Sequence, residues 1–129
     1  MDIELSDDER THLGMLAMNI LDEWRLAPVD QLALMGMPEK TKPRELSRYR
    51  NGTTPLPKDP EVIRHARHVL GIQESLHVIF PLNGNMPSFW LKHRNKVLRG
   101  IPLEIMLDEG ISGMSRVWRQ LDCTQNWTD

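Results

Sequence analysis

Basic side chains gather in one short stretch of the sequence. Within eleven residues stand five of them, opposed by Glu45 alone: Lys40, Lys42, Arg44, Arg48 and Arg50. Lysine and arginine bind the phosphates of nucleic acids, and arginine also reads the edge of guanine. In a chain whose net charge is −2, this segment predicts a local contact with a polyanion. A solvated, charge-rich turn and helix is the alternative.

Histidine and cysteine residues offer two other kinds of chemistry. His65 and His68 lie three apart and could face one metal ion in a small metal-dependent enzyme. However, no cysteine or carboxylate follows at a ligand spacing, so the polar flank of a helix is the expected role. Cys123 could pair with a histidine as a nucleophile and base, yet nothing in the sequence brings them together. We expect no catalytic residue, metal or cofactor, and no enzymatic activity.

Helices must position all these residues, because apolar side chains recur at helical spacing and no segment alternates as a strand does. Ser6 and Glu9 form a capping-box pattern, and Gly71 is expected to end or kink a helix. The predicted helices cover residues 7–24, 28–36, 43–50, 59–70, 72–80, a short stretch from 89, 102–107 and a last one capped by Ser112. The sequence thus predicts an all-α fold, with residues 53–57 as a linker.

The same periodicity predicts which side chains are buried. In the second helix the expected inward residues are Val29, Leu32 and Ala33. In the second half the expected core anchors are Phe89, Trp90 and Leu98. For Trp90, direct contact with a partner is the alternative. Asn95 is expected to hydrogen-bond the backbone of a turn, and Gly100 to adopt the backbone angles needed before Pro102.

Three short predicted helices within residues 7–51 match the requirements of a helix-turn-helix DNA-binding unit. In such a unit the second helix braces the third, which enters the major groove. Leu46 and Tyr49 would anchor the third helix, so that its polar side chains face outward. The expected DNA-binding residues are Lys40, Lys42, Arg44, Ser47, Arg48 and Arg50.

The amino-acid sequence of this region resembles that of a known family. The string LSRYRNGTTPL, residues 46–56, resembles the end of the recognition helix in Xre (phage-repressor-like) regulators. Gln31, Leu32, Ala33 and Gly36 resemble the second-helix stretch of the same family. The segment between Gly36 and Leu46 is longer than the usual turn of such motifs.

A second resemblance lies in the string WLKHRNKVLRGIPLEIMLDEG, residues 90–110. It resembles the toxin-binding domain of the Xre/MbcA/ParS-like antitoxins. The matching elements are Trp90-Leu91, Asn95, Leu98, Gly100, Pro102-Leu103, Met106-Leu107 and Gly110. The resemblance covers about residues 24–121, so it takes in most of the chain.

The resemblance implies a function. It implies an antitoxin that binds a RES-domain toxin, which degrades NAD, and buries the toxin's NAD site. It also implies that a homodimer binds the operon's promoter DNA. The toxin-binding residues that it implies are Trp90, Asn95, Arg99, Gly100, Trp118, Gln125, Asn126 and Trp127. A stand-alone Xre-like transcriptional regulator without a toxin partner is the alternative.

Length and charge set the expected organisation. The 129 residues allow one domain or two very small ones, and we expect a helix-turn-helix region over 1–58 and a toxin-binding domain over 59–129. Residues 1–30 carry a charge of −6, residues 31–68 carry +4, and the remainder is neutral. The acidic N-terminus does not read as a signal peptide, and no apolar run is long enough to span a membrane. A single cysteine fits a reducing compartment, so we expect a cytoplasmic protein.

Overall fold

Local signals in the sequence set where the helices begin. The computed structural model of the chain describes residues 4–128, and the side chains of residues 4–124. The hydroxyl of Ser6 accepts from the Glu9 amide at 3.1 Å, and the Glu9 carboxylate accepts from the Ser6 amide at 2.9 Å. Proline occupies the first turn of five further elements, where no amide hydrogen is needed.

Helices account for all the regular structure within residues 4–128, which confirms the predicted all-α fold. The elements are α1 (Asp7–Glu23), α2 (Pro28–Leu34), the 3₁₀ turn η1 (Pro43–Glu45), α3 (Leu46–Arg50), α4 (Pro60–Ile79), α5 (Met86–Lys92), α6 (Pro102–Glu109) and α7 (Ile111–Thr128). No helix in this part of the chain has the length and apolar character needed to cross a membrane.

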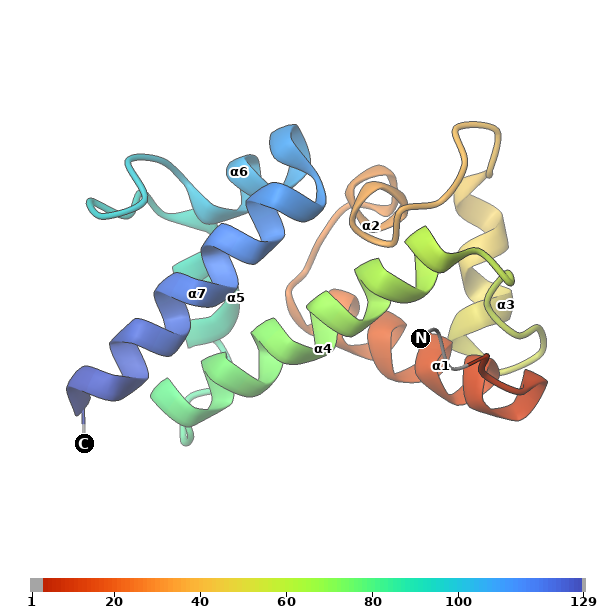
Figure 1. Cartoon of the computed structure of the whole chain (residues 1–129), viewed down its shortest axis with the longest axis horizontal. Coiled ribbons are helices and arrows are strands. Elements are labelled where there is room, and N and C mark those ends of the chain that lie inside the picture. The colour runs from red at the N-terminus through yellow and green to blue at the C-terminus, as the bar shows by residue number, and fades with distance from the viewer. Residues whose placement is uncertain (1–3, 129) are drawn as a thin grey trace.

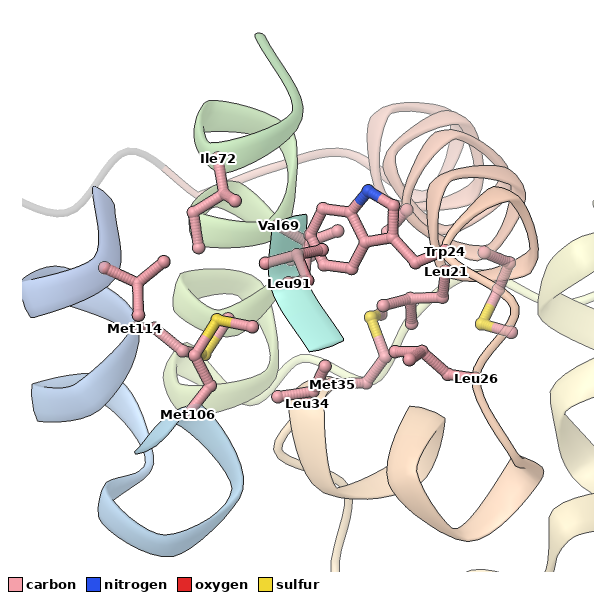
Figure 2. Packing of buried hydrophobic residues seen from close by; sticks show 14 of the residues in the cluster. Leu21, Trp24, Leu26, Leu34, Met35, Val69, Ile72, Leu91, Met106 and Met114 are labelled. Atoms are coloured by element: carbon pink, nitrogen blue, oxygen red, sulfur yellow. The ribbon is translucent and has the colours of Figure 1, made fainter. Parts of the chain in front are cut away.

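The long helix α4 runs through the centre of the molecule (Figure 1). α1 packs on one part of α4 and carries α3, whereas α7 packs on the other part together with α6 and α5. One cluster of buried side chains draws on both halves of the chain, including Leu21 from α1, Trp24 directly after it, and Met106 and Met114 from α6 and α7 (Figure 2). The functional boundary near residue 58 stays a prediction, because this core is continuous across it.

Trp24 links three helices at the centre of that core. Its side chain is fully buried, and its indole Nε1–H donates to Oε1 of Gln73 in α4 at 2.8 Å. The Gln73 amide in turn donates to Glu23 at 2.6 Å. The hydroxyl of Ser88, in α5, donates to the Trp24 carbonyl at 2.9 Å. Every polar group of this junction therefore has a partner, as burial requires.

The segment before α4 is non-helical, as expected, but it does not behave as a free linker. Leu56 is fully buried, and its carbonyl oxygen accepts from Nε of Arg10 at 2.8 Å. The same guanidinium donates to the Leu5 carbonyl at 2.9 Å and pairs with Asp7 at 2.6 Å. Arg10 itself is only 6% exposed. This segment is thus fixed against α1.

Several local expectations are wrong. In α2, Val29 is 68% exposed and Ala33 is also exposed, whereas Gln31 and Leu34 are buried. Ser112 does not cap the last helix, because α7 already begins at Ile111. The local sequence pattern therefore does not fix the buried face of α2 or the first residue of α7, and tertiary packing determines both.

Gly71 does not end a helix, because α4 continues through it from Pro60 to Ile79. Its missing side chain makes room for α7. A Cβ atom at this position would overlap the six-membered ring of Trp118. The glycine is therefore a notch that receives the indole, at a position where helix propensity alone would favour another residue.

Candidate interaction surfaces

The first candidate surface is the basic segment, which we define as Lys40, Lys42, Arg44, Ser47 and Arg48. All five side chains are exposed, on the turn after α2, on η1 and on α3. Within the described residues, none of the four cations forms an ion pair. The Ser47 hydroxyl donates to the Arg44 carbonyl at 3.0 Å, which keeps it close to the backbone. Four unpaired cations in a short segment can each approach an external anion.

Arg50 is placed differently from the other predicted DNA-binding residues. Its Nε donates to Asp22 at 2.7 Å, and one terminal nitrogen donates to Asp22 at 3.1 Å and to Gln31 at 3.3 Å. Gln31 also donates to Asp22, at 3.0 Å. The expectation that Arg50 faces outward is therefore wrong: its guanidinium is half-buried and holds α3 to α1 and α2.

This arrangement favours the ionised form of Asp22. Burial raises the pKa of its carboxyl, but the hydrogen bonds from Arg50 and Gln31 and the charge of Arg50 together lower the pKa by more than burial raises it. The net effect holds the pKa of Asp22 below its usual value. The pair thus stays charged over the neutral pH range and fixes the orientation of α3.

The predicted third helix, residues 43–50, is built from η1 and α3. Leu46 is buried and Tyr49 is half-buried, as the spacing predicts. Burial raises the pKa of the Tyr49 hydroxyl, helped by Glu45 and opposed by Arg48. α3 packs mainly on α1, and α2 contacts η1, which is the first turn of the predicted third helix. Gln31 of α2 also accepts from Arg50 of α3 at 3.3 Å, so the second and third predicted helices are in contact, and their role as a helix-turn-helix unit stays a prediction.

The second candidate surface follows α5, where the resemblance places partner contacts. Trp90 is half-buried, so it contributes to the core and keeps part of its ring accessible. Asn95 fixes the turn that follows, because its Oδ1 accepts from the Leu98 amide at 2.9 Å. Its backbone also pairs with Gly100, through bonds of 2.8 and 3.3 Å. The expected bond from an asparagine side chain to a turn is confirmed.

Two expectations about this second surface are wrong. Phe89 is no core anchor: it is 53% exposed and stacks on His93, with ring centroids 3.7 Å apart. The left-handed backbone conformation falls on Arg99, with φ of 60°, and not on Gly100. Gly100 instead packs closely on Ile105, whose nearest side-chain atom would lie 3.3 Å from a Cβ.

Trp118 lies in the Gly71 notch on the α4–α7 contact. Its indole meets the His68 ring edge-on, with centroids 5.3 Å apart. Part of the ring stays accessible and lines a groove of about 780 Å³ beside the N-terminal segment, together with Ile63 and Arg67. Gln125, Asn126 and Trp127 lie outside the residues whose side chains are described.

The two histidines with a possible metal spacing are engaged in packing. Nδ1–H of His65 donates to the Glu61 carbonyl at 2.7 Å, and Nδ1–H of His68 donates to the Arg64 carbonyl at 2.8 Å. Nε2 of His68 then accepts from the Ser115 hydroxyl at 3.1 Å. No group of three or more potential ligands gathers within the described part of the chain. Cys123 is exposed.

Arg94 and Lys96, two exposed cations close to the predicted Arg99, were not among the residues predicted from sequence. They belong to a stretch, residues 75–103, that contains no aspartate or glutamate. Summing charge over the whole second half hid this asymmetry, because the acidic residues that balance it lie in other segments. A shorter charge window would have found it.

A comparison with known proteins finds a relative of similar length. No protein-family model matches the chain. It is 27% identical over 119 residues to a protein of Sinorhizobium fredii named "Uncharacterized protein y4oB". The matched region covers 91% of this chain and 88% of that protein. The similarity therefore extends over nearly the full length of both proteins, and it assigns no activity.

Proposed function

We propose that this protein is the antitoxin of a toxin–antitoxin pair. In this proposal it binds a RES-type, NAD-degrading toxin through its second half, blocks the toxin's active site and performs no chemistry itself. A homodimer also binds operator DNA through the basic segment. The observation that carries the proposal is the placement of two accessible surfaces at opposite ends of one continuous core (Figure 1).

The DNA-binding part rests on the basic segment and on the rigidity of α3. Four exposed cations without internal partners lose little when they bind phosphate. The Arg50–Asp22 pair fixes the helix that carries two of the polar side chains of the segment, so little ordering is needed on binding. The acidic first helix makes a second constraint, because it must face away from the duplex.

The toxin-binding part rests on the sequence resemblance of residues 90–110 and on the accessibility of this region. Trp90 and Trp118 are both half-buried, each anchored in the core with part of its ring exposed. Tryptophan and arginine are enriched among residues that dominate protein interfaces. A rigid scaffold that presents anchored tryptophans suits a role as a stoichiometric inhibitor.

The proposal first predicts that a gene for a RES-domain protein stands next to this one. Co-expression of the two should restore growth that the toxin alone stops, and the two proteins should co-purify. A toxin that neither co-purifies nor loses toxicity contradicts the antitoxin role. DNA binding without any effect on a RES-domain toxin would favour the stand-alone regulator.

A double variant separates the two surfaces. Arg44→Ala with Arg48→Ala removes two exposed cations, so the slope of log affinity for promoter DNA against log salt should fall by about 1.8. Neutralisation of the toxin should remain intact. The matched control is Arg64→Ala with Arg67→Ala, which removes two exposed cations of α4. Loss of both activities in the first variant would contradict the division of labour between the surfaces.

A further inference from the structure

The chain between α5 and α6 forms a preorganised hairpin, which we call the basic hairpin and define as residues 92–100. In Figure 1 it projects from the end of the molecule opposite α3. Two backbone hydrogen bonds between Asn95 and Gly100 close it, and the Asn95 side chain fixes the turn inside it. Leu98 is buried, and its carbonyl accepts from Arg116 at 3.1 Å. The backbone of the hairpin is therefore set before anything binds to it.

The side chains of the basic hairpin carry positive charge that the protein does not neutralise. Arg94, Lys96 and Arg99 are exposed, and none of them forms an ion pair with any residue in the described part of the chain. The Lys92 ammonium donates to the Arg25 carbonyl at 2.9 Å. Arg116, which donates to the Leu98 carbonyl, is already paired with Glu109 at 2.8 Å.

An aromatic pair adjoins these cations. The rings of Phe89 and His93 stack with an interplanar angle of 19°, and both side chains are exposed. Nδ1–H of His93 donates to the Phe89 carbonyl at 2.6 Å, which fixes the orientation of the ring. The pair therefore presents a flat, fixed aromatic surface to solvent beside three free cations.

We propose that the basic hairpin and the Phe89–His93 stack bind single-stranded nucleic acid. Arg94, Lys96 and Arg99 contact the phosphodiester backbone, and an unpaired base stacks on the aromatic pair. Surfaces that combine cations with exposed aromatic rings bind single strands, because every base has a π-face while duplex bases are hidden. This binding uses none of the basic segment, and it does not require the antitoxin function. The hairpin lies within residues 90–110, so a bound strand and a bound toxin would share this surface.

The test measures fluorescence anisotropy of labelled oligo(dT) and oligo(U) with the full chain, from about 50 to about 300 mM KCl. The triple variant Arg94→Gln/Lys96→Gln/Arg99→Gln should bind at least about tenfold more weakly at low salt. The slope of log affinity against log salt should fall by up to about 2, since each phosphate contact contributes about 0.7. Phe89→Ala, which keeps every cation, should weaken binding by about fivefold or more. Preference for one oligonucleotide then identifies DNA or RNA as the source of the strand.

A control variant tests whether loss of net charge alone would weaken the binding of the oligonucleotides. Lys58→Gln/Arg64→Gln/Arg67→Gln has the same net charge as the hairpin variant, but its substitutions lie at exposed positions on and just before α4. It should bind the oligonucleotides within about twofold of wild type. Circular dichroism of each variant confirms that the helices remain.

Four results would overturn the proposal. The first two are failure of the wild-type protein to bind either oligonucleotide at the lowest salt, and a loss of affinity in the control as large as that in the hairpin variant. Stronger hairpin-dependent binding to a duplex of the same length would show that unpaired bases are not required. Equal hairpin-dependent binding to poly-L-glutamate would instead indicate an acidic protein surface as the ligand.

Discussion

The contact between Gly71 and Trp118 predicts whether Gly71→Ala raises or lowers the free energy of unfolding, and the direction of the change tests the contact. Gly71 lies in the interior of α4, where alanine is favoured over glycine by about 1 kcal/mol. If nothing packed on this position, Gly71→Ala would stabilise the protein. However, the added methyl group would overlap the Trp118 indole, which is also held by its edge contact with His68. Overpacking costs about 1–3 kcal/mol, and an overlap this severe belongs in the upper part of that range, which leaves a net loss of about 1–2 kcal/mol after the gain in propensity.

We therefore expect Gly71→Ala to lower the free energy of unfolding by about 1–2 kcal/mol, which corresponds to about 4–8 °C in Tm for a domain of this size. The assay is urea denaturation followed by circular dichroism at the helical band. In a Trp118→Leu background the overlap disappears. There the same Gly71→Ala change should be neutral or should stabilise by up to about 1 kcal/mol.

Gly84→Ala is the matched control, because no atom lies within 4 Å of a Cβ at that position. It should leave stability unchanged or raise it slightly, through the entropy of the unfolded chain. If Gly71→Ala stabilises the protein in the presence of Trp118, the indole does not occupy the notch. The account of how α7 packs on α4 would then be wrong.

Three further predictions concern polar groups that hold the helices together. Asp22→Asn should remove part of the acid sensitivity of folding. Because the pKa of Asp22 is lower in the folded protein, its ionised carboxylate stabilises the fold at pH values above the ordinary pKa of 3.8, and this stability is lost as the pH falls through the folded pKa. Urea midpoints at pH 7 and pH 3 measure this, and an unchanged difference would contradict a role for the Arg50 pair. Trp24→Phe should destabilise by about 2 kcal/mol or more, because the buried Gln73 loses its donor; a loss under about 0.5 kcal/mol by denaturation would speak against the junction. Arg10→Leu should cost about 1–3 kcal/mol by leaving a linker carbonyl unpaired, and faster proteolysis of residues 53–57 should accompany it.

Helix starts could be predicted from sequence because their signals are local. Ser6 and Glu9 satisfy each other within one turn, and Pro28 or Pro60 fits a first turn whatever lies elsewhere in the chain. The periodicity of α7 also sufficed, since Met114, Val117 and Leu121 are all fully buried.

Contacts between distant segments could not be predicted in the same way. A glycine such as Gly71 is typical of a helix end. Only its contact with Trp118, forty-seven positions later in the sequence, shows that it makes room for the indole inside a continuous helix. Arg50 looks like an outward cation until Asp22 of α1 is placed beside it. Phe89 satisfies a core pattern, but hydrophobicity does not by itself decide burial.

The two candidate surfaces also differ in whether local sequence signals reveal them. The basic segment was identified from sequence because its charge is concentrated in a short stretch with one opposing acid. In the basic hairpin the resemblance pointed to Arg99, but Arg94 and Lys96 were missed, because only the turn closed by Asn95 and Gly100 brings these three cations into one short hairpin.

The most direct test of the central claim is the NAD content of cells that express the proposed partner, a RES-domain toxin encoded next to this gene, with and without this protein. Our account predicts that NAD collapses with the toxin alone and stays near the uninduced level when this protein is co-expressed. It also predicts that Arg44→Ala/Arg48→Ala protects NAD as well as wild type, because neutralisation does not need the basic segment. NAD that falls equally with and without this protein would contradict the antitoxin function.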